Sequence, residues 1–153
     1  AEDGRKTASQ IALLTGRPEA AVAAAIARYE EEGVIVKYRA ILNYEKMAEE
    51  NGLVRALIEV NITPQHGLGF DAIAERIYNF PEVKSCYLLS GGYDLLLVVE
   101  CHSLREVGAF VAERLATLVN VTRTATHFLL KVYKENGDIL QPVEKNPRLP
   151  ISP

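Results

Sequence analysis

A short aliphatic run behind a pair of glycines constrains this chain more than any other feature. Residues 95–99 read Leu-Leu-Leu-Val-Val, and Gly91-Gly92 separate them from another apolar run that begins at Val83. A Gly-Gly pair can take the positive φ angles of a two-residue turn, so the pattern predicts an antiparallel β-hairpin. Successive side chains of a strand point to opposite faces, and in residues 95–99 both faces are apolar. Both faces of this strand must therefore be covered.

One of the two covers has to come from outside the chain. Helices from the same 153 residues can cover one face of the predicted sheet, but the sequence offers no second layer. We therefore expect a second copy of the protein on the other face. With Gly91-Gly92 at the turn, Cys86 lies opposite Leu97, out of register for a disulfide with Cys101. The two cysteines are therefore expected to be small buried side chains.

The composition indicates a soluble globular protein with no overall attraction for nucleic acid. The chain is 48% hydrophobic and 24% charged, and its formal net charge is -3. No apolar run reaches the roughly 18 residues of a membrane span, and no secretory pattern stands at the start, which favours a cytoplasmic protein without a membrane partner. Any contact with DNA must therefore come from a local patch.

Two helices near the N-terminus have the spacing of a helix-turn-helix. Thr7 and Gln10 form a capping box in front of a helix that ends at Gly16, and Pro18 opens a second helix that ends at Gly33. A plain helical hairpin fits this spacing equally well. The residues that follow the second helix help to decide between a helix-turn-helix and a plain helical hairpin.

Residues 34–42 alternate in the manner of a β-strand, directly behind the second helix. The alternation places Lys37 and Arg39 on one face, where two cations could hold phosphates. A strand in this position is typical of the wing of a winged helix-turn-helix. Basic pairs on exposed strands are also common on any protein surface.

The remainder of the chain predicts an α+β domain of the ferredoxin-like type. Its order is β-α-β-β-α-β, which gives a four-stranded antiparallel sheet with both helices on one face. The second helix of this domain is expected to bury Leu104. The expected elements are a strand over residues 52–63, a helix over 68–80, the hairpin over 83–101, a helix over 103–118 and a strand over 121–133.

Three sequence blocks in this order resemble the Lrp/AsnC family, the feast/famine regulatory proteins. They are EEGVIVKYRAILNYEK, LLSGGYDLLLVVE and VTRTATHFLL. The resemblance covers Thr7 to about Gly137 and implies three parts. Residues 1–47 would form a winged helix-turn-helix that lacks the family's first helix, residues 48–137 an effector-binding (RAM) and oligomerisation domain, and residues 138–153 a proline-rich tail.

The resemblance implies a transcriptional regulator that binds double-stranded DNA, without a cofactor or metal. Family members pair sheet to sheet into homodimers, often assemble further to an octamer, and bind an amino-acid effector near the Gly-x-Tyr-Asp turn. Asp94 is expected either to receive polar groups of that effector or to bond the turn backbone. The candidate effector residues are Gly91, Gly92, Tyr93, Asp94, Thr124, Thr126 and His127.

The second helix of the helix-turn-helix is poor in side chains that read bases. Base edges in the major groove call for Arg, Lys, Asn or Gln, whereas the outward positions here are largely alanine. Cations and carboxylates balance over residues 1–47, so one dimer is expected to bind DNA weakly. We expect the affinity to come from several DNA-binding domains presented by one oligomer. The candidate DNA-binding residues are Arg17, Glu19, Ala20, Ala23, Ala24, Arg28, Lys37 and Arg39.

Two other classes of function compete with the regulator. A ligand-sensing or assembly module with little sequence-specific DNA binding fits the alanine-rich helix. Some proteins similar to the family decarboxylate a haem precursor, but they use a histidine and arginine cluster that SCYLLSGGYDLLLV does not contain. The sequence therefore predicts no enzyme. His66, His102 and His127 have no spacing typical of metal ligands.

Overall fold

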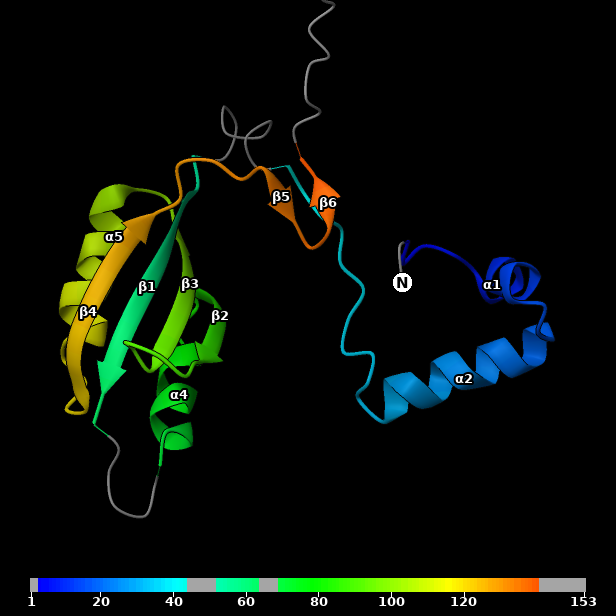
Figure 1. The fold of residues 1–153 in the computed structure, drawn as a ribbon, viewed down its shortest axis with the longest axis horizontal. Coiled ribbons are helices and arrows are strands. Elements are labelled where there is room, and N and C mark those ends of the chain that lie inside the picture. Colours follow the sequence, from blue (N-terminus) through cyan, green and yellow to red (C-terminus); the bar gives the residue numbers. More distant parts are fainter. Residues whose placement is uncertain (1–2, 44–51, 64–68, 141–153) are drawn as a thin grey trace, which may run out of the picture. The chain divides into compact units, whose positions relative to one another are not determined.

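The structure is a computed structural model that describes residues 3–43, 52–63 and 69–140. The chain divides into two compact units, Ala1–Leu42 and Asn43–Pro153 (Figure 1). Residues 44–51 and most of the predicted proline-rich tail lie outside the described residues, as does the predicted helix start at Leu68.

The first unit contains the two predicted helices, α1 (Ala8–Thr15) and α2 (Glu19–Glu31). The capping box is formed as expected: the Thr7 hydroxyl accepts from the Gln10 amide at 3.3 Å, and the Gln10 side chain accepts from the Thr7 amide at 2.9 Å. Gly16 ends α1 with φ 67°, a left-handed conformation that glycine adopts without strain.

The predicted wing strand over residues 34–42 is not formed, and this prediction was wrong. A strand is stabilised by hydrogen bonds to a neighbour, and no strand of the described residues pairs with this segment. The apolar side chains that the alternation placed inward are in solvent, since Val36 is 89% exposed. The segment is held instead by the Tyr38 hydroxyl, which donates to a Glu30 carboxylate oxygen at 2.9 Å.

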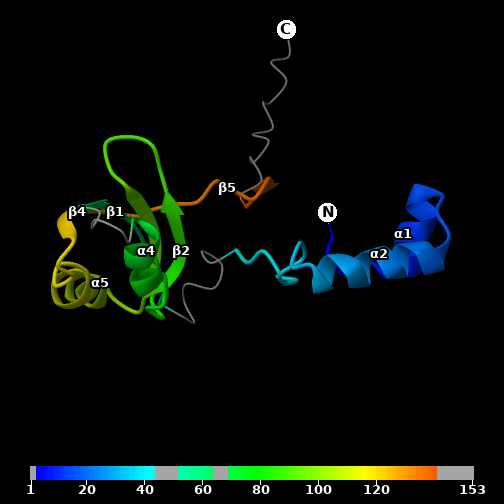
Figure 2. The same cartoon turned by 90° about the horizontal axis from the view of Figure 1, so that it is seen from below.

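The second unit has the predicted ferredoxin-like arrangement. Its antiparallel sheet has the order β2-β3-β1-β4, and its helices lie on one face (Figures 1 and 2). The strands are β1 (Val54–Ile62), β2 (Val83–Leu88), β3 (Leu95–Cys101) and β4 (Val121–Phe128), and the helices are α4 (Asp71–Tyr78) and α5 (Leu104–Phe110), which continues as a π-helical turn, Val111–Leu115.

Alternation along β3 separates a covered face of the sheet from an open face. Leu95, Leu97 and Val99 are fully buried against the helices, whereas Leu96 and Val98 are half-buried on the opposite face. The expectation that helices cover one face is confirmed. Nothing within the described part of the chain covers the other face completely, and we call it the open face.

The hairpin has the predicted register but not the predicted turn. Cys86 pairs with Leu97 as expected, and both cysteines are free. The strands, however, stop at Leu88 and Leu95, and neither Gly91 nor Gly92 has a positive φ. A six-residue loop, residues 89–94, replaces the two-residue turn. The Leu89 amide donates to the Asp94 carbonyl at 2.9 Å across the base of this loop, and β1 also bonds Asp94.

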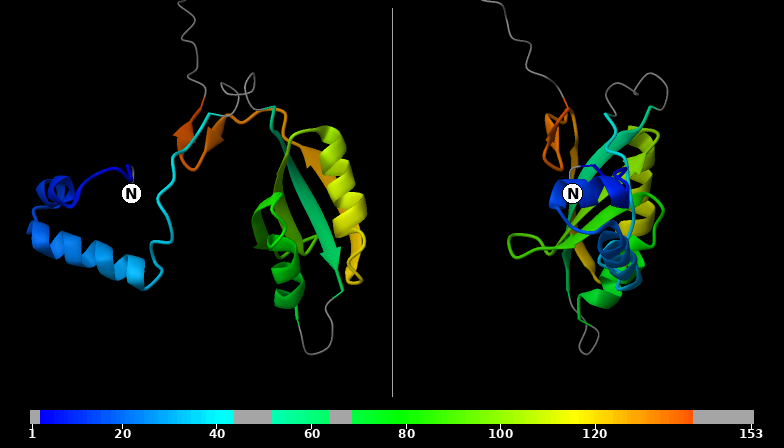
Figure 3. Two further views of the ribbon diagram at one scale, coloured as in Figure 1. Left: turned by 180° about the vertical axis from the view of Figure 1, so that it is seen from behind. Right: turned by 90° about the vertical axis from the view of Figure 1, so that its right-hand side faces the viewer.

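Three further predictions about the second unit need correction. Leu104 is 60% exposed, because it lies in the first turn of α5 on the solvent side. The last strand ends at Phe128 and not at residue 133. Beyond it, β5 (Lys134–Glu135) pairs with β6 (Asp138–Ile139), although residues 138 onward were expected to form a tail. Figure 3 shows this small hairpin beyond the end of β4.

Candidate effector site and nucleic-acid interface

The loop at residues 89–94 is fastened to β1 through Asp94. One Asp94 carboxylate oxygen accepts from the Ile62 amide at 2.8 Å, and the Asp94 amide donates to the Val60 carbonyl at 3.1 Å. The pairing of β1 with β3 ends at Val60 and Leu95, so the Ile62 amide lies beyond the last β3 partner and is available for this bond. The Asp94 carboxylate thus bonds backbone, but the backbone of β1 rather than that of its own turn.

The glycines of the loop remain accessible. Gly91 and Gly92 are exposed, and a Cβ built on either would meet nothing within 4 Å. The Gly92 carbonyl accepts from the Asn61 side-chain amide at 3.1 Å, which fixes the backbone of the loop from β1. Tyr93 is half-buried beside Asp94. The loop therefore presents open backbone on a rigid support.

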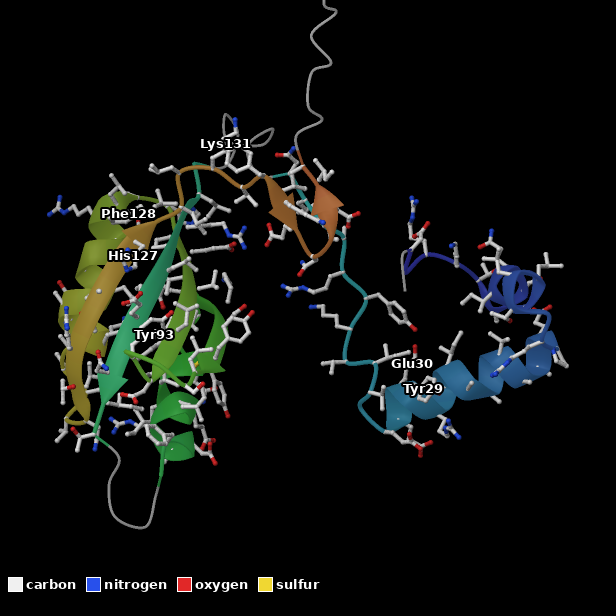
Figure 4. The ribbon with its side chains drawn as sticks, in the orientation of Figure 1. Tyr29, Glu30, Tyr93, His127, Phe128 and Lys131 are labelled. Atoms are coloured by element: carbon white, nitrogen blue, oxygen red, sulfur yellow. The ribbon has the colours of Figure 1, made fainter. Side chains whose placement is uncertain are left out.

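The three candidate residues on β4 do not face the same way. Thr124 pairs with Val60 and Thr126 with Ile58, so both threonines share the covered face with the core. His127 pairs with Leu57 and lies on the open face. The structure therefore brings Thr124 into the same end of the sheet as the loop and places His127 on the other side of the sheet, near the Phe128 end of β4 (Figure 4).

The open face combines aliphatic side chains with charged pairs. Its register positions are Arg55, Leu57, Glu59 and Asn61 on β1, Leu96, Val98 and Glu100 on β3, Ser85 and Tyr87 on β2, and Arg123, Ala125 and His127 on β4. Nε2 of His127 lies 3.4 Å from a Glu59 carboxylate oxygen, an ion pair when the imidazole is protonated. Leu57, Leu96 and Val98 lie between the charged groups.

One charged cluster was not found by sequence reasoning. Nε of Arg55 lies 3.0 Å from a Glu100 oxygen, and its two terminal nitrogens donate to the two Glu135 oxygens at 3.2 Å each. Glu135 belongs to the small β5–β6 hairpin, 80 residues from Arg55 in sequence. No local pattern signals a pair at that separation.

A cavity of about 470 Å³ lies at the other end of β3, away from the loop. Its charged side chains are largely engaged: Arg114 pairs with Glu82 at 3.1 Å, Glu106 accepts from the His102 amide at 2.9 Å, and Lys84 donates to a backbone carbonyl at 2.8 Å. These contacts engage most of the charged groups of the wall without a ligand. Burial raises the pKa of the Cys101 thiol in the same wall.

In the first unit, the candidate DNA-binding residues of α2 are on the surface. Arg17, Glu19, Ala20, Ala23, Ala24 and Arg28 are all exposed, while Val22 is buried behind them. Arg28 is held near Glu32 at 3.7 Å and lies over the Tyr29 ring, 5.1 Å from its centroid. Of these two arginines, Arg28 on α2 is therefore matched by a carboxylate, and Arg17 lies just before the helix.

Lys37 and Arg39 are exposed in the segment expected as a wing. Because that segment is not a strand, the alternation that placed the two cations on one face does not apply. Beside them, the hydrogen bond to Glu30 raises the pKa of the Tyr38 hydroxyl. The cations are available to phosphates, but no wing holds them in place.

Comparison with known proteins identifies the family of the second unit and of the chain. The model of the Lrp/AsnC ligand binding domain matches residues 55–139. A Bacillus subtilis HTH-type transcriptional regulator, YugG, is 41% identical over 152 residues, which cover 99% of this chain and 91% of the relative. The chain belongs to the Lrp/AsnC family.

Solved structures of similar regulators agree with the fold. A feast or famine regulatory protein of Mycobacterium tuberculosis, solved with L-methionine, has TM-score 0.71 and 28% identity and covers 92% of this chain and 90% of its own. A Neisseria meningitidis regulator, also with L-methionine, has TM-score 0.69 and 26% identity, covering 88% of this chain and 84% of its own. The relatives are transcriptional regulators and not enzymes.

Two negative findings apply to the described residues alone. No helix there combines the length and apolar character needed to cross a membrane. No group of three or more histidine, cysteine, aspartate or glutamate side chains gathers there in a way that could hold a metal ion.

Proposed function

We propose that this Lrp/AsnC protein is a DNA-binding transcriptional regulator that pairs through its open sheet face and responds to an amino acid. The observation that supports pairing most directly is the half-burial of Leu96 and Val98 on β3, next to fully buried neighbours. Covering aliphatic surface contributes about 25 cal/mol per Å², and the chain itself leaves part of this surface exposed. A second copy brings the same surface and covers both at once.

The DNA-binding function rests on the exposed face of α2 and on family membership. Arg17 and the exposed alanines offer few groups for base readout, and Arg28 is partly neutralised by Glu32. The DNA-binding unit of one chain, here called a head, thus recognises bases weakly. An assembly of several chains, up to an octamer, raises the affinity because a second head binds at high effective concentration once the first is bound. The proposed DNA contacts are Arg17, Glu19, Ala20, Ala23, Ala24, Arg28, Lys37 and Arg39.

The effector site is proposed at the loop of residues 89–94. The L-methionine complexes of the two regulators above support an amino acid as ligand. Backbone groups of Gly91 and Gly92 are open, and Asp94 has one carboxylate oxygen beyond the one that bonds Ile62. Thr124 and Thr126 on the covered face, and Tyr93 beside Asp94 in the loop, are the further residues proposed for the site. His127 lies on the open face, so it contributes only through an adjoining copy.

Selection of DNA fragments by the full-length protein tests the regulator directly. The regulator predicts an enriched sequence, strong affinity for DNA with several copies of that sequence and a shallow salt dependence for a single dimer, because the heads carry balanced charge. An isolated dimer that binds one site tightly with a steep salt slope would contradict the weak-head account. No enriched sequence would favour the assembly module, which the alanine-rich face of α2 suggests.

Sedimentation of the protein with and without a panel of amino acids tests the effector. One amino acid should change the size of the assembly at a concentration that leaves the others without effect. Asp94→Asn keeps an oxygen acceptor for the Ile62 amide and removes the charge. The variant should fold and assemble but lose the response, whereas an unchanged response would remove Asp94 from the site.

A further inference from the structure

The small β5–β6 hairpin holds two points of the chain that are separated in sequence. Glu135 on β5 binds the Arg55 guanidinium through two hydrogen bonds of 3.2 Å. At the other end of the hairpin, the Leu140 carbonyl accepts from the Asn43 side-chain amide at 2.9 Å. Asn43 directly follows the first unit, and Arg55 is the second residue of β1. One hairpin therefore fastens the chain before and after residues 44–54.

The contact between Arg55 and Glu135 is a bidentate ion pair, which is stronger than a single hydrogen bond between neutral groups. The Arg55 side chain is 18% exposed, and those of Glu100 and Glu135 are 12% and 27% exposed. A forked pair fixes orientation as well as charge, and solvent and salt screen a partly buried pair less than a surface pair. The hairpin is itself closed by the Leu140 amide, which donates to the Tyr133 carbonyl at 3.1 Å.

We infer that the β5–β6 hairpin fixes the point at which the segment that follows the DNA-binding helices joins the sheet domain. Arg55 and Asn43 are the positioning residues of this junction. Without the hairpin, Asn43 could lie as far from residue 54 as an extended chain reaches, on the order of 40 Å at about 3.5 Å per residue. With Asn43 held on the sheet domain, that freedom is removed.

The fixed position of Asn43 affects DNA binding when each head binds weakly. This step of the inference rests on the proposed function. When several heads of one assembly bind neighbouring DNA sites, the second binding step depends on an effective concentration that falls as the tether becomes longer and looser. Fixing Asn43 shortens the tether without adding any contact to DNA. The hairpin therefore raises affinity for adjacent sites and leaves affinity for a single site unchanged.

The first test uses the protein alone and two matched variants. Glu135→Gln and Glu100→Gln each remove one carboxylate from the same guanidinium, but only Glu135 belongs to the hairpin. Amide hydrogen exchange at Leu140 should become about tenfold faster in Glu135→Gln, since a charge-assisted pair is lost, and stay near the wild-type rate in Glu100→Gln. Equal rates at Leu140 in Glu135→Gln and wild type would overturn the fastening, as would equal acceleration in both variants.

The second test measures DNA binding of the same full-length assemblies. The probe is a duplex that the wild-type protein selects from a random-sequence pool, in one copy and in two adjacent copies. Glu135→Gln and Asn43→Ala should each lose several-fold in affinity for the double site with little change at the single site, and Glu100→Gln should match wild type. Unchanged double-site affinity in a variant with fast Leu140 exchange would refute the positioning role. If no duplex is selected, the proposed function fails while the exchange result still decides the fastening.

Discussion

The two faces of the four-stranded sheet differ in what covers them, although β3 supplies aliphatic side chains to both. On the covered face, Leu97 is buried under helices of the same chain among other apolar residues. On the open face, Leu96 is half-buried, and its neighbour Glu59 pairs with His127. The covered face thus has the composition of a core, and the open face mixes apolar and charged groups as protein interfaces do. The difference shows which face the chain completes by itself and which face the proposed pairing would cover.

Truncation on the covered face should have the largest effect on stability. Leu97→Ala removes a fully buried side chain, and such changes typically cost about 2–5 kcal/mol of the free energy of unfolding. Leu96→Ala, one residue away on the open face, is the matched control and should cost much less in a dissociated chain. Urea unfolding at low protein concentration measures both. Similar losses would mean that the two faces are equally buried within one chain.

The loop at the edge of the sheet should respond less strongly. Asp94→Ala leaves the Ile62 amide without its acceptor and should cost about 1–3 kcal/mol, measured by urea unfolding. Asp94→Asn keeps an acceptor oxygen and serves as the control, with a smaller loss. If both variants were as stable as wild type, the hydrogen bond between Ile62 and Asp94 would contribute nothing to the free energy of unfolding.

The smallest predicted effect concerns the two thiols, which share the covered face. Burial raises the pKa of Cys86 and of Cys101, so the folded state keeps both thiols protonated at a pH where the unfolded chain ionises. Their contribution to stability is therefore complete below the ordinary thiol pKa and is lost as the pH rises through the raised pKa of the folded state. Unfolding of wild type and of Cys86→Ala/Cys101→Ala between pH 7 and pH 10 should differ in slope. Parallel curves would contradict thiol burial on the covered face.

Much of the second unit could be predicted because its signals are local. The order of elements followed from periodicity, and the hairpin register followed from the position of Gly91-Gly92, even though the turn is wider than a two-residue turn. The bond between Asp94 and Ile62 ties this loop to β1, and no local pattern signals it, because the two residues are 32 positions apart. The opposite orientation of Thr126 and His127 was readable, since neighbouring residues of a strand face opposite ways.

The first unit was less predictable for a different physical reason. Capping residues such as Thr7 and Gly16 act within one turn of helix, and both helices were found. The segment over residues 34–42 has strand alternation, but alternation forms a strand only where another strand supplies hydrogen bonds. The same limit applies to Arg55 and Glu135, whose pairing depends on how a distant hairpin folds back. Function at such positions follows from the structure and not from the local sequence.

Sedimentation of the purified full-length protein at micromolar concentration tests the pairing of open faces most directly. The account predicts a dimer or a larger assembly, and a folded monomer for Val98→Lys, which places a charge among the aliphatic side chains of the open face. The control is circular dichroism of the variant, which should show the same fold as the wild-type protein. A wild-type protein that is a well-folded monomer under these conditions would contradict the account, because the open face would then be stable in water without a partner.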